Sequence, residues 1–245
     1  MSVDLTMRDL SDGKLLTLYV ERNDASALKE LVTRHAPFVM RVGTQMLFPA
    51  QGVDDVCQIV FLKLIEKGPQ IKNRDCLSSW LYSVTQRTVQ EYRRESSKVS
   101  LPGKLDPMSN EQPIEDREQL SILHEEMEKL PLKYREPLLL CDLQNLSRQA
   151  VAEMLKTTEA AVKARLARGR KLLKQRLLVR GVTFASVLVM WHASSVHAAD
   201  YVAGPLVEQL MQQSFNSSVT GVGQAPANYT FSKGGMRWLL PLRKS

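Results

Sequence analysis

The sequence lacks most of what a metal centre or a disulfide framework requires. Its three cysteines, Cys57, Cys76 and Cys141, lie far apart, and no two of them form a C-x-x-C pair. The four histidines do not join the cysteines at the spacing of zinc ligands. We therefore expect no metal site, and three reduced thiols in or near the core, as is typical of a cytoplasmic protein.

Features of catalysis and of export are missing as well. The sequence contains no glycine-rich phosphate loop and no nucleophile–base constellation, so we expect neither an enzyme nor a bound cofactor. The chain begins Met1-Ser2-Val3-Asp4, without a basic stretch followed by an apolar one, which argues against a signal peptide. The function must then come from binding.

Positive charge is present in excess. The chain carries 33 lysines and arginines against 26 aspartates and glutamates, a formal net charge of +7, and its pI is about 9.4. An excess of this size favours an anionic partner, either a nucleic acid or an acidic membrane surface. The position of the charges along the chain decides between the two.

Helical periodicity dominates the first two thirds of the chain, where strand alternation is scarce. Gly68-Pro69 ends one helical segment, and a polar, basic loop follows it. The pattern predicts an all-α fold. The apolar stripes of the first part run from Leu28 to Met46, from about Asp54 to Ile65 and from Leu77 to Tyr92.

One segment divides the chain. Residues 96–117 are rich in serine, proline and glycine and have few large apolar side chains, so they are typical of a flexible linker. The linker separates a first small helical domain at residues 10–95 from a second at residues 118–180. Residues 181–245 form a C-terminal extension with an apolar helix and a poorly ordered tail.

The second domain contains a predicted helix-turn-helix. Ser147 is expected to cap a short helix that ends near Leu155, and a long helix begins at about Thr158. The turn between the two helices is Lys156-Thr157-Thr158, which is the length that such a motif requires. Further upstream, Pro137 predicts a kink or a late start of its helix.

The long helix carries basic residues of one sign. Between Lys163 and Arg180 there are eight lysines and arginines and no acidic residue, beside an apolar stripe that begins at Val162. Solvated helices usually mix both signs, so this row indicates DNA phosphates as the partner. The candidates for base edges are Thr158, Glu159, Lys163, Ala164 and Ala167, and those for the DNA backbone are Arg148, Arg165, Arg168 and Arg170.

Four segments together resemble the extracytoplasmic-function subfamily of bacterial RNA polymerase sigma factors, over about residues 12–178. What carries the resemblance is that all four occur in the order of the family, with a linker between the second and third. The segments are Val53–Phe61, an acidic helix start; Ser78–Tyr82, followed by Arg93-Arg94; Leu130–Leu140; and Thr158–Arg170, which is similar to the recognition helix of the family.

The resemblance implies a sigma factor that binds core RNA polymerase, recognises promoter DNA, opens the strands and starts transcription. The first domain would dock on the clamp helices of the largest polymerase subunit, and the second on the flap of the second-largest subunit. An anti-sigma factor is left open as a further partner. The implied core-binding residues are Asp54, Asp55, Gln58 and Phe61.

The resemblance also implies that the first domain holds the unpaired strand of the downstream promoter element. A polar loop beside aromatic residues can hold an extruded base, and Tyr82 is a candidate stacking platform, whereas Trp80 lies on the apolar stripe and is assigned to the core. Arg87 and Lys156 depart from the residues common in the family. The candidate residues for the downstream element are Ile71, Lys72, Asn73, Arg74, Asp75 and Arg87.

The extension allows two interpretations. Residues 181–199 contain no charged residue and just reach the length of a membrane span. Several serines and histidines there weaken insertion, so membrane association is left open but not favoured over a helix that packs on the second domain or on a partner. We hypothesise that the extension regulates the protein, by masking its DNA helix or by responding to a partner.

Two other functions remain open at this point. A helix-turn-helix regulator that acts without core polymerase would explain the basic helix, but it leaves the first domain without a task. A membrane-associated DNA-binding regulator, with the basic helix on anionic lipid, would explain the apolar segment that follows.

Overall fold

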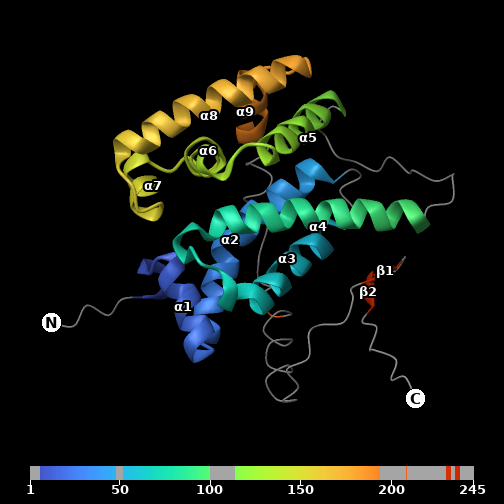
Figure 1. The fold of residues 1–245 in the computed structure, drawn as a ribbon. Helices are drawn as coiled ribbons and strands as arrows, with labels where there is room; N and C mark the ends of the chain where they lie inside the picture. Colours follow the sequence, from blue (N-terminus) through green and yellow to red (C-terminus); the bar gives the residue numbers. More distant parts are fainter. Residues whose placement is uncertain are drawn as a thin grey trace.

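The computed structural model describes residues 6–47, 52–99, 114–193, 208, 230–232 and 235–237. Its helices lie in two layers, with α1 to α4 below and α5 to α9 above (Figure 1). The lower layer comprises α1 (Asp12–Arg22), α2 (Ala25–Met46), α3 (Val53–Lys67) and α4 (Leu77–Val99), with short 3-10 turns η1 (Met7–Asp9), η2 (Gly68–Gln70) and η3 (Arg74–Cys76). The upper layer comprises α5 (Ile114–Glu128), α6 (Leu132–Leu138), the π-helical turn η4 (Leu139–Leu143), α7 (Arg148–Met154), α8 (Glu159–Val179) and α9 (Phe184–Ala193).

The three apolar stripes of the first part are confirmed as α2, α3 and α4. The Asp24 side chain caps α2 by accepting hydrogen bonds from the backbone N–H groups of Ser26 and Ala27. The apolar stripes did not predict α1. This helix is tied to α2 by an ion pair from Asp12 to Arg34 at 2.7 Å and by a hydrogen bond between Asp12 and His35 Nε2 at 2.8 Å. Arg74, which donates to Thr17 Oγ1 at 2.8 Å, joins α1 to the loop that precedes α4.

The predicted helix-turn-helix is confirmed as α7 and α8. Ser147 accepts a hydrogen bond from the N–H of Ala150, so the predicted cap of α7 is confirmed. The predicted start of α8 is also confirmed, and Thr158 caps it by accepting a hydrogen bond from the N–H of Ala161. Lys156 adopts a left-handed conformation in the turn, with φ of 49°. This is the conformation that glycine most readily supplies, so lysine forms the turn at some cost in strain.

The helix before this motif contains an irregularity that the sequence located only in part. Pro137 lies inside α6, which begins at Leu132, so the predicted late start is wrong. The disturbance follows the proline instead, as the π-helical turn Leu139–Leu143. Gly169 of α8 packs on this region, where an added Cβ would lie 3.0 Å from a methyl carbon of Leu138.

The buried side chains of both layers form one continuous apolar cluster, from Leu15 in α1 to Trp191 in α9. The three cysteines are free, as predicted, and burial raises the pKa of the Cys76 thiol to about 12. In the part of the chain that the structure describes, no helix is both long and apolar enough to cross a membrane.

The boundaries between the predicted segments are partly visible. The predicted linker, residues 96–117, overlaps the end of α4 and the start of α5, and residues 100–113 lie outside the described residues. In the extension, α9 lies within the predicted apolar stretch. The antiparallel strands β1 (Thr230–Ser232) and β2 (Gly235–Arg237) form a short hairpin that was not predicted.

The apolar stripe of α8 should carry the stability of the upper layer. Leu166 is 3% exposed, so Leu166→Ala is expected to lower the free energy of unfolding by about 2–5 kcal/mol. Lys163→Ala, on the exposed face of the same helix, should change it by less than about 0.5 kcal/mol. Urea unfolding followed by circular dichroism measures both. Equal losses for the two variants would contradict this assignment of faces.

Candidate nucleic-acid interface

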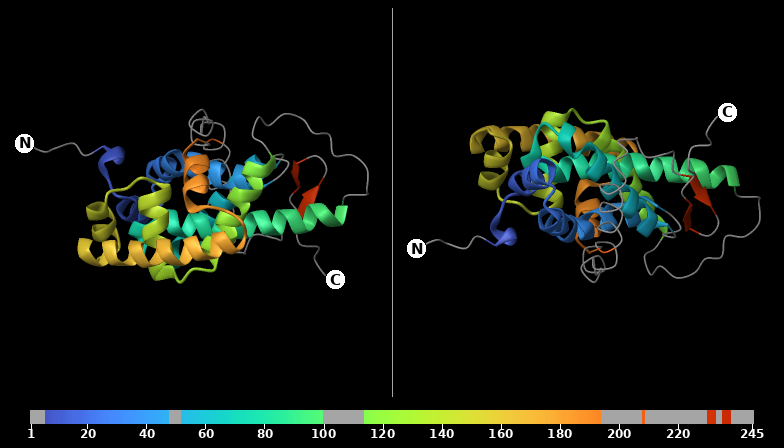
Figure 2. Two further views of the ribbon diagram at one scale, coloured as in Figure 1. Left: turned by 90° about the horizontal axis from the view of Figure 1, so that it is seen from above. Right: turned by 90° about the horizontal axis from the view of Figure 1, so that it is seen from below.

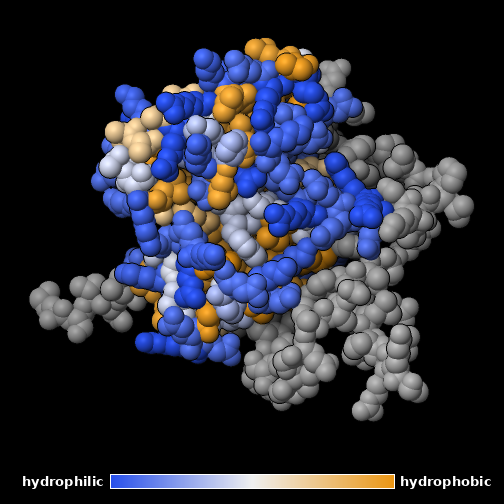
Figure 3. Space-filling view, viewed as in Figure 1, coloured by the Kyte–Doolittle hydropathy of each residue, from blue (hydrophilic) through white to orange (hydrophobic). Residues whose placement is uncertain are grey.

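The outward face of α8 is basic and exposed, and its inward face is apolar. Val162, Leu166, Leu173 and Leu177 are buried against the rest of the upper layer. Figure 3 shows hydrophilic residues over most of the α8 layer at the top of the molecule. The sequence candidates that are exposed there are Thr158, Glu159, Lys163, Ala164, Ala167, Arg168 and Arg170, while Arg165 is half-buried.

The start of α8 is positioned by α7. Arg148, at the first position of α7, lies 3.4 Å from the carboxylate of Glu159 at the first position of α8. Both side chains are about half exposed, so this ion pair contributes little stability. It does hold two of the candidate DNA contacts next to each other, at the end of α8 that helix-turn-helix proteins place in the major groove.

A hollow of about 490 Å³ lies between η4, α7 and the middle of α8. Its rim carries the cations of Arg148, Lys163 and Arg170, together with the carboxylate of Asp142. A rim of this charge suits a phosphate of a DNA backbone that runs along α8, because phosphate contacts fix the register of a protein on the duplex. The hollow therefore belongs to the same surface as the exposed face of α8.

Arg170 is engaged more firmly than the sequence indicated. Its guanidinium donates two hydrogen bonds to Asp142, at 2.9 Å from Nε and 2.5 Å from an Nη atom. The Asp142 side chain is only 8% exposed, and its hydrogen bond raises the pKa of Arg170. Arg170 thus joins α8 to η4, and two of its five N–H donors are already used.

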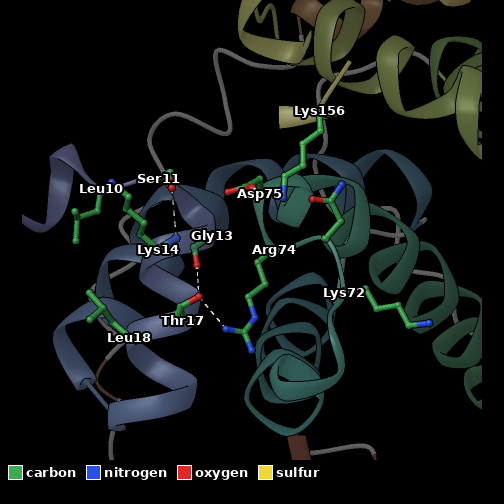
Figure 4. Close-up of a pocket in the computed structure, with 11 residues that line it drawn as sticks. Leu10, Ser11, Gly13, Lys14, Thr17, Leu18, Lys72, Arg74, Asp75 and Lys156 are labelled. Atoms are coloured by element: carbon green, nitrogen blue, oxygen red, sulfur yellow. Dashed lines mark hydrogen bonds and ion pairs between the residues drawn. The ribbon is translucent and has the colours of Figure 1, made fainter. Parts of the chain in front are cut away.

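A second polar surface surrounds the loop before α4, where a cavity of about 600 Å³ opens beside α1 (Figure 4). Lys72 and Asn73 are exposed on the rim of this cavity. Arg74 points instead toward α1, where it donates to Thr17 Oγ1 at 2.8 Å and lies 3.6 Å from Glu21.

The remaining downstream candidates differ in their exposure. Asp75 is half-buried and lines the cavity, Ile71 is buried, and Arg87 is exposed on α4, ten or more residues further along the chain. Tyr82, the candidate stacking platform, is wholly buried and cannot stack on a base in this conformation. Trp80 is partly buried and packs on the core, in line with its assignment.

The acidic start of α3 presents fewer side chains than expected. Asp54 is exposed and Asp55 is half-buried, in the first turn after Gly52. Burial and the neighbouring Asp54 charge raise the pKa of Asp55. Gln58 is 7% exposed and Phe61 is wholly buried, so only the two aspartates of this group are available at the surface.

The structure also shows cavity residues that the sequence did not single out. Lys14 and Thr17 of α1 line the cavity opposite the loop, and Lys156 reaches into it from the helix-turn-helix turn (Figure 4). No local sequence pattern predicts that these residues share a cavity, because α1 and the end of α7 reach the loop from distant parts of the chain. Within the described residues, no group of three histidine, cysteine or acidic side chains could hold a metal ion.

Comparison with protein families gives two matches. Residues 31–99 match the model described as sigma-70 region 2, and residues 120–173 match the model described as sigma-70, region 4. The first match spans most of α2, α3 and α4, which carry the loop before α4. The second spans the helix-turn-helix and most of α8.

Individual proteins similar to this chain are named as RNA polymerase sigma factors. The chain is 35% identical over 127 residues to RNA polymerase sigma factor SigZ of Bacillus subtilis, covering 51% of this chain and 72% of that protein. It is 24% identical over 186 residues to the ECF RNA polymerase sigma-E factor of Escherichia coli K12, covering 70% and 97%. Among solved structures, CnrH in complex with the cytosolic domain of CnrY matches with 20% identity and a TM-score of 0.38, over 69% of this chain and 97% of that chain.

The Arg170–Asp142 contact should be structural. Arg170→Ala leaves a largely buried carboxylate without its partner, so we expect a loss of about 1–3 kcal/mol in the free energy of unfolding. Lys171→Ala, at the next position and exposed, should cost less than about 0.5 kcal/mol. Thermal and urea unfolding of both variants check this. If Arg170→Ala left the free energy of unfolding unchanged, the Arg170 side chain would not be needed for the fold and would be available to bind a phosphate.

Proposed function

The chain belongs to the extracytoplasmic-function branch of the RNA polymerase sigma factors, and we propose that its two helical domains divide promoter recognition between duplex DNA and a separated strand. A sigma factor directs promoter recognition and transcription initiation. In this proposal residues 10–95 form the first domain and residues 118–180 the second. Its partners are core RNA polymerase and promoter DNA, and it makes and breaks no covalent bond.

The observation that carries the proposal is the two-faced α8. Lys163, Ala164, Ala167 and Arg168 share the exposed face, while Val162 and Leu166 anchor the opposite face. A helix presented in this way enters the major groove by its first turns, where lysine and arginine contact guanine and small side chains contact thymine methyls. The second domain accordingly reads the upstream element as duplex.

The first domain suits a separated strand. Exposed Lys72 and Asn73 supply a cation and an amide at the rim of a cavity, and Lys14 adds a second cation from α1. A strand held here is retained by its phosphates and by contacts to an extruded base. Such binding shifts the DNA toward the open state only by its preference for that state. Arg87 extends this surface along α4.

Core polymerase would meet the acidic start of α3. Asp54 and Asp55 are the accessible members of the expected set, and they lie at a helix N-terminus. Gln58 and Phe61 are buried, so they would contribute indirectly, by fixing the position of α3. The second domain would contact the flap of the second-largest subunit. We place the protein in the cytoplasm, where the polymerase works.

The decisive experiment combines the purified full chain with core RNA polymerase that lacks any sigma factor, and maps transcripts from a library of host genomic fragments. Discrete start sites that require both components support the proposal and identify the promoter. A chain that binds duplex DNA but neither binds core polymerase nor yields transcripts would favour a helix-turn-helix regulator that acts alone.

Contacts of α8 with phosphates should appear in the salt dependence of DNA binding. Arg168→Ala is expected to weaken binding to a duplex at low salt, and to reduce the slope of log K against log salt by about 0.9, because Arg168 is an exposed candidate for the DNA backbone. Gln175→Ala, an exposed neutral residue of the same helix, serves as the control and should leave the slope unchanged. Fluorescence anisotropy over a salt series measures both. An unchanged slope for Arg168→Ala would remove this arginine from the interface.

Substitutions in α3 should affect core-polymerase binding and folding stability separately. Asp54→Ala is expected to weaken the affinity for core polymerase by about threefold to tenfold without loss of stability, because this carboxylate is exposed. Phe61→Ala should lower the free energy of unfolding by about 3–5 kcal/mol, because the ring is wholly buried. Glu66→Ala, an exposed acid at the other end of α3, is the matched control for binding. Equal effects of Asp54→Ala and Glu66→Ala would argue against a local core-binding site.

A further inference from the structure

The two helix layers meet around a single tryptophan of the extension. Trp191 of α9 is wholly buried, and Figure 2 shows α9, in orange, next to α2 and α5. Its ring lies edge-on to Phe38 at 6.3 Å and to His124 at 5.7 Å between centroids, and the Arg41 guanidinium lies 5.0 Å from it. Its indole N–H donates to the Leu143 carbonyl at 2.8 Å. One side chain therefore contacts α2 of the lower layer and α5 and η4 of the upper layer.

A buried hydrogen-bond network surrounds the same point. His124 of α5 accepts from the Tyr82 hydroxyl at Nδ1, 2.8 Å away, and donates from Nε2 to Gln45 Oε1 at 3.1 Å. Gln86 donates to the His124 carbonyl at 2.9 Å. The three partners come from α2 and α4. This assignment of protons makes the imidazole neutral, and it is the assignment that satisfies both ring nitrogens.

The layers also meet at the two DNA-reading surfaces. Lys156, in the helix-turn-helix turn, lies 4.0 Å from Asp75 in the loop before α4. Nearby, the Cys76 thiol donates to the Met154 carbonyl at 3.5 Å. In Figure 4 the Lys156 side chain points from the upper layer toward the rim of the cavity. The turn that precedes the recognition helix is thus packed against the loop proposed to hold a separated strand.

These contacts are difficult to reconcile with simultaneous binding of both DNA elements. A duplex that receives the first turns of α8 in its major groove, about 12 Å wide, places its backbones on either side of those turns. Asp75 and the loop around it already occupy the space beside the turn. The basic face of α8 stays exposed beside α9, so α9 itself does not cover that face.

We propose that α9 is an intramolecular clasp, which holds the two helix layers in a closed arrangement through Trp191 and must release before the layers can separate to reach the two polymerase subunits and a promoter. The extension then lowers activity by restricting the separation of the two layers. That α9 holds the layers together does not depend on the proposed function. That its release raises activity does rest on the proposed function. Release makes the loop before α4 and the turn of the helix-turn-helix accessible independently of each other.

The test compares the full chain with Trp191→Ala and with Val189→Ala, an exposed position of the same helix that serves as the matched control. Small-angle X-ray scattering reports the separation of the layers, and titration reports the affinity for core polymerase. Trp191→Ala should raise the radius of gyration by about a tenth or more over the compact value for its length. It should also strengthen the apparent affinity for core polymerase by about tenfold, because the competent fraction increases. Val189→Ala should change neither quantity.

A second variant acts from the other layer. Phe38→Leu removes the aromatic contact of α2 with the Trp191 ring without altering α9, so it should give a smaller change in the same direction even if Trp191→Ala folds poorly. An unchanged radius for both variants would overturn the clasp, as would an increased radius without a change in core affinity. A radius increase in chains that do not bind core polymerase at all would support the clasp and contradict the proposed function.

The pH provides an independent measurement on the unmodified chain. Burial lowers the pKa of His124 to about 3 in the closed arrangement, whereas an exposed imidazole titrates near 6.5. The open form therefore binds the additional proton, and opening should gain about tenfold for each pH unit below 6.5. Hydrogen exchange of the Trp191 indole N–H follows the open fraction even when that fraction is small, and an opening constant that stays the same from pH 7.5 to 5.5 would count against the clasp. His124 contacts Gln45 on α2, Tyr82 and Gln86 on α4, and Trp191 on α9, whose ring also meets the Arg41 guanidinium. The adjacent acids Glu125 and Glu126 on α5 pair with Arg180 after α8.

Discussion

The neutral imidazole of His124 is the group on which the arrangement of the two layers depends. It is wholly buried, and a charged ring there would lose its hydration without gaining an anionic partner. The neutral ring is stable at this place only because Tyr82 and Gln45, from two helices of the lower layer, satisfy its nitrogens. The orientation of α5 against α2 and α4 follows from these two bonds, and α9 closes the site from the other side.

The long helix α8 shows how one element meets two demands at once. Its buried leucines fix it to the upper layer, so its exposed lysines and arginines need not contribute stability and are free to contact a ligand. Arg170 is an exception, since its bidentate contact with Asp142 makes it part of the scaffold. Arg180, at the end of the same row, pairs with Glu125 and Glu126 of α5. A row of cations in the sequence therefore contains members with different tasks, and the positions of their acidic partners distinguish them.

Local sequence patterns predicted most of the helices and the caps, because periodicity and capping are properties of neighbouring residues. Ser147 marks the start of its helix without help from the rest of the chain. Contacts between distant segments could not be predicted in this way. The burial of Gln58 and Phe61, and the Lys156 side chain in the cavity, depend on how complete helices pack. The docking of α9 is the clearest case, since a helix that is apolar on all sides does not indicate which of its residues will meet a partner.

The interface between the layers is held by a small difference between opposing terms. Truncation of a buried tryptophan such as Trp191 usually costs about 3–5 kcal/mol in the free energy of unfolding, which sets an upper bound on how strongly it favours closure. Against this, the same interface buries Arg41 Nε, Gln45 Nε2 and Gln86 Oε1 with no hydrogen-bond partner among the described residues. Each such atom costs about 1–3 kcal/mol, so the two contributions are of similar size. An interface balanced in this way closes specifically, because the network around His124 accepts one geometry, and it can still open when a partner binds the separated layers more tightly.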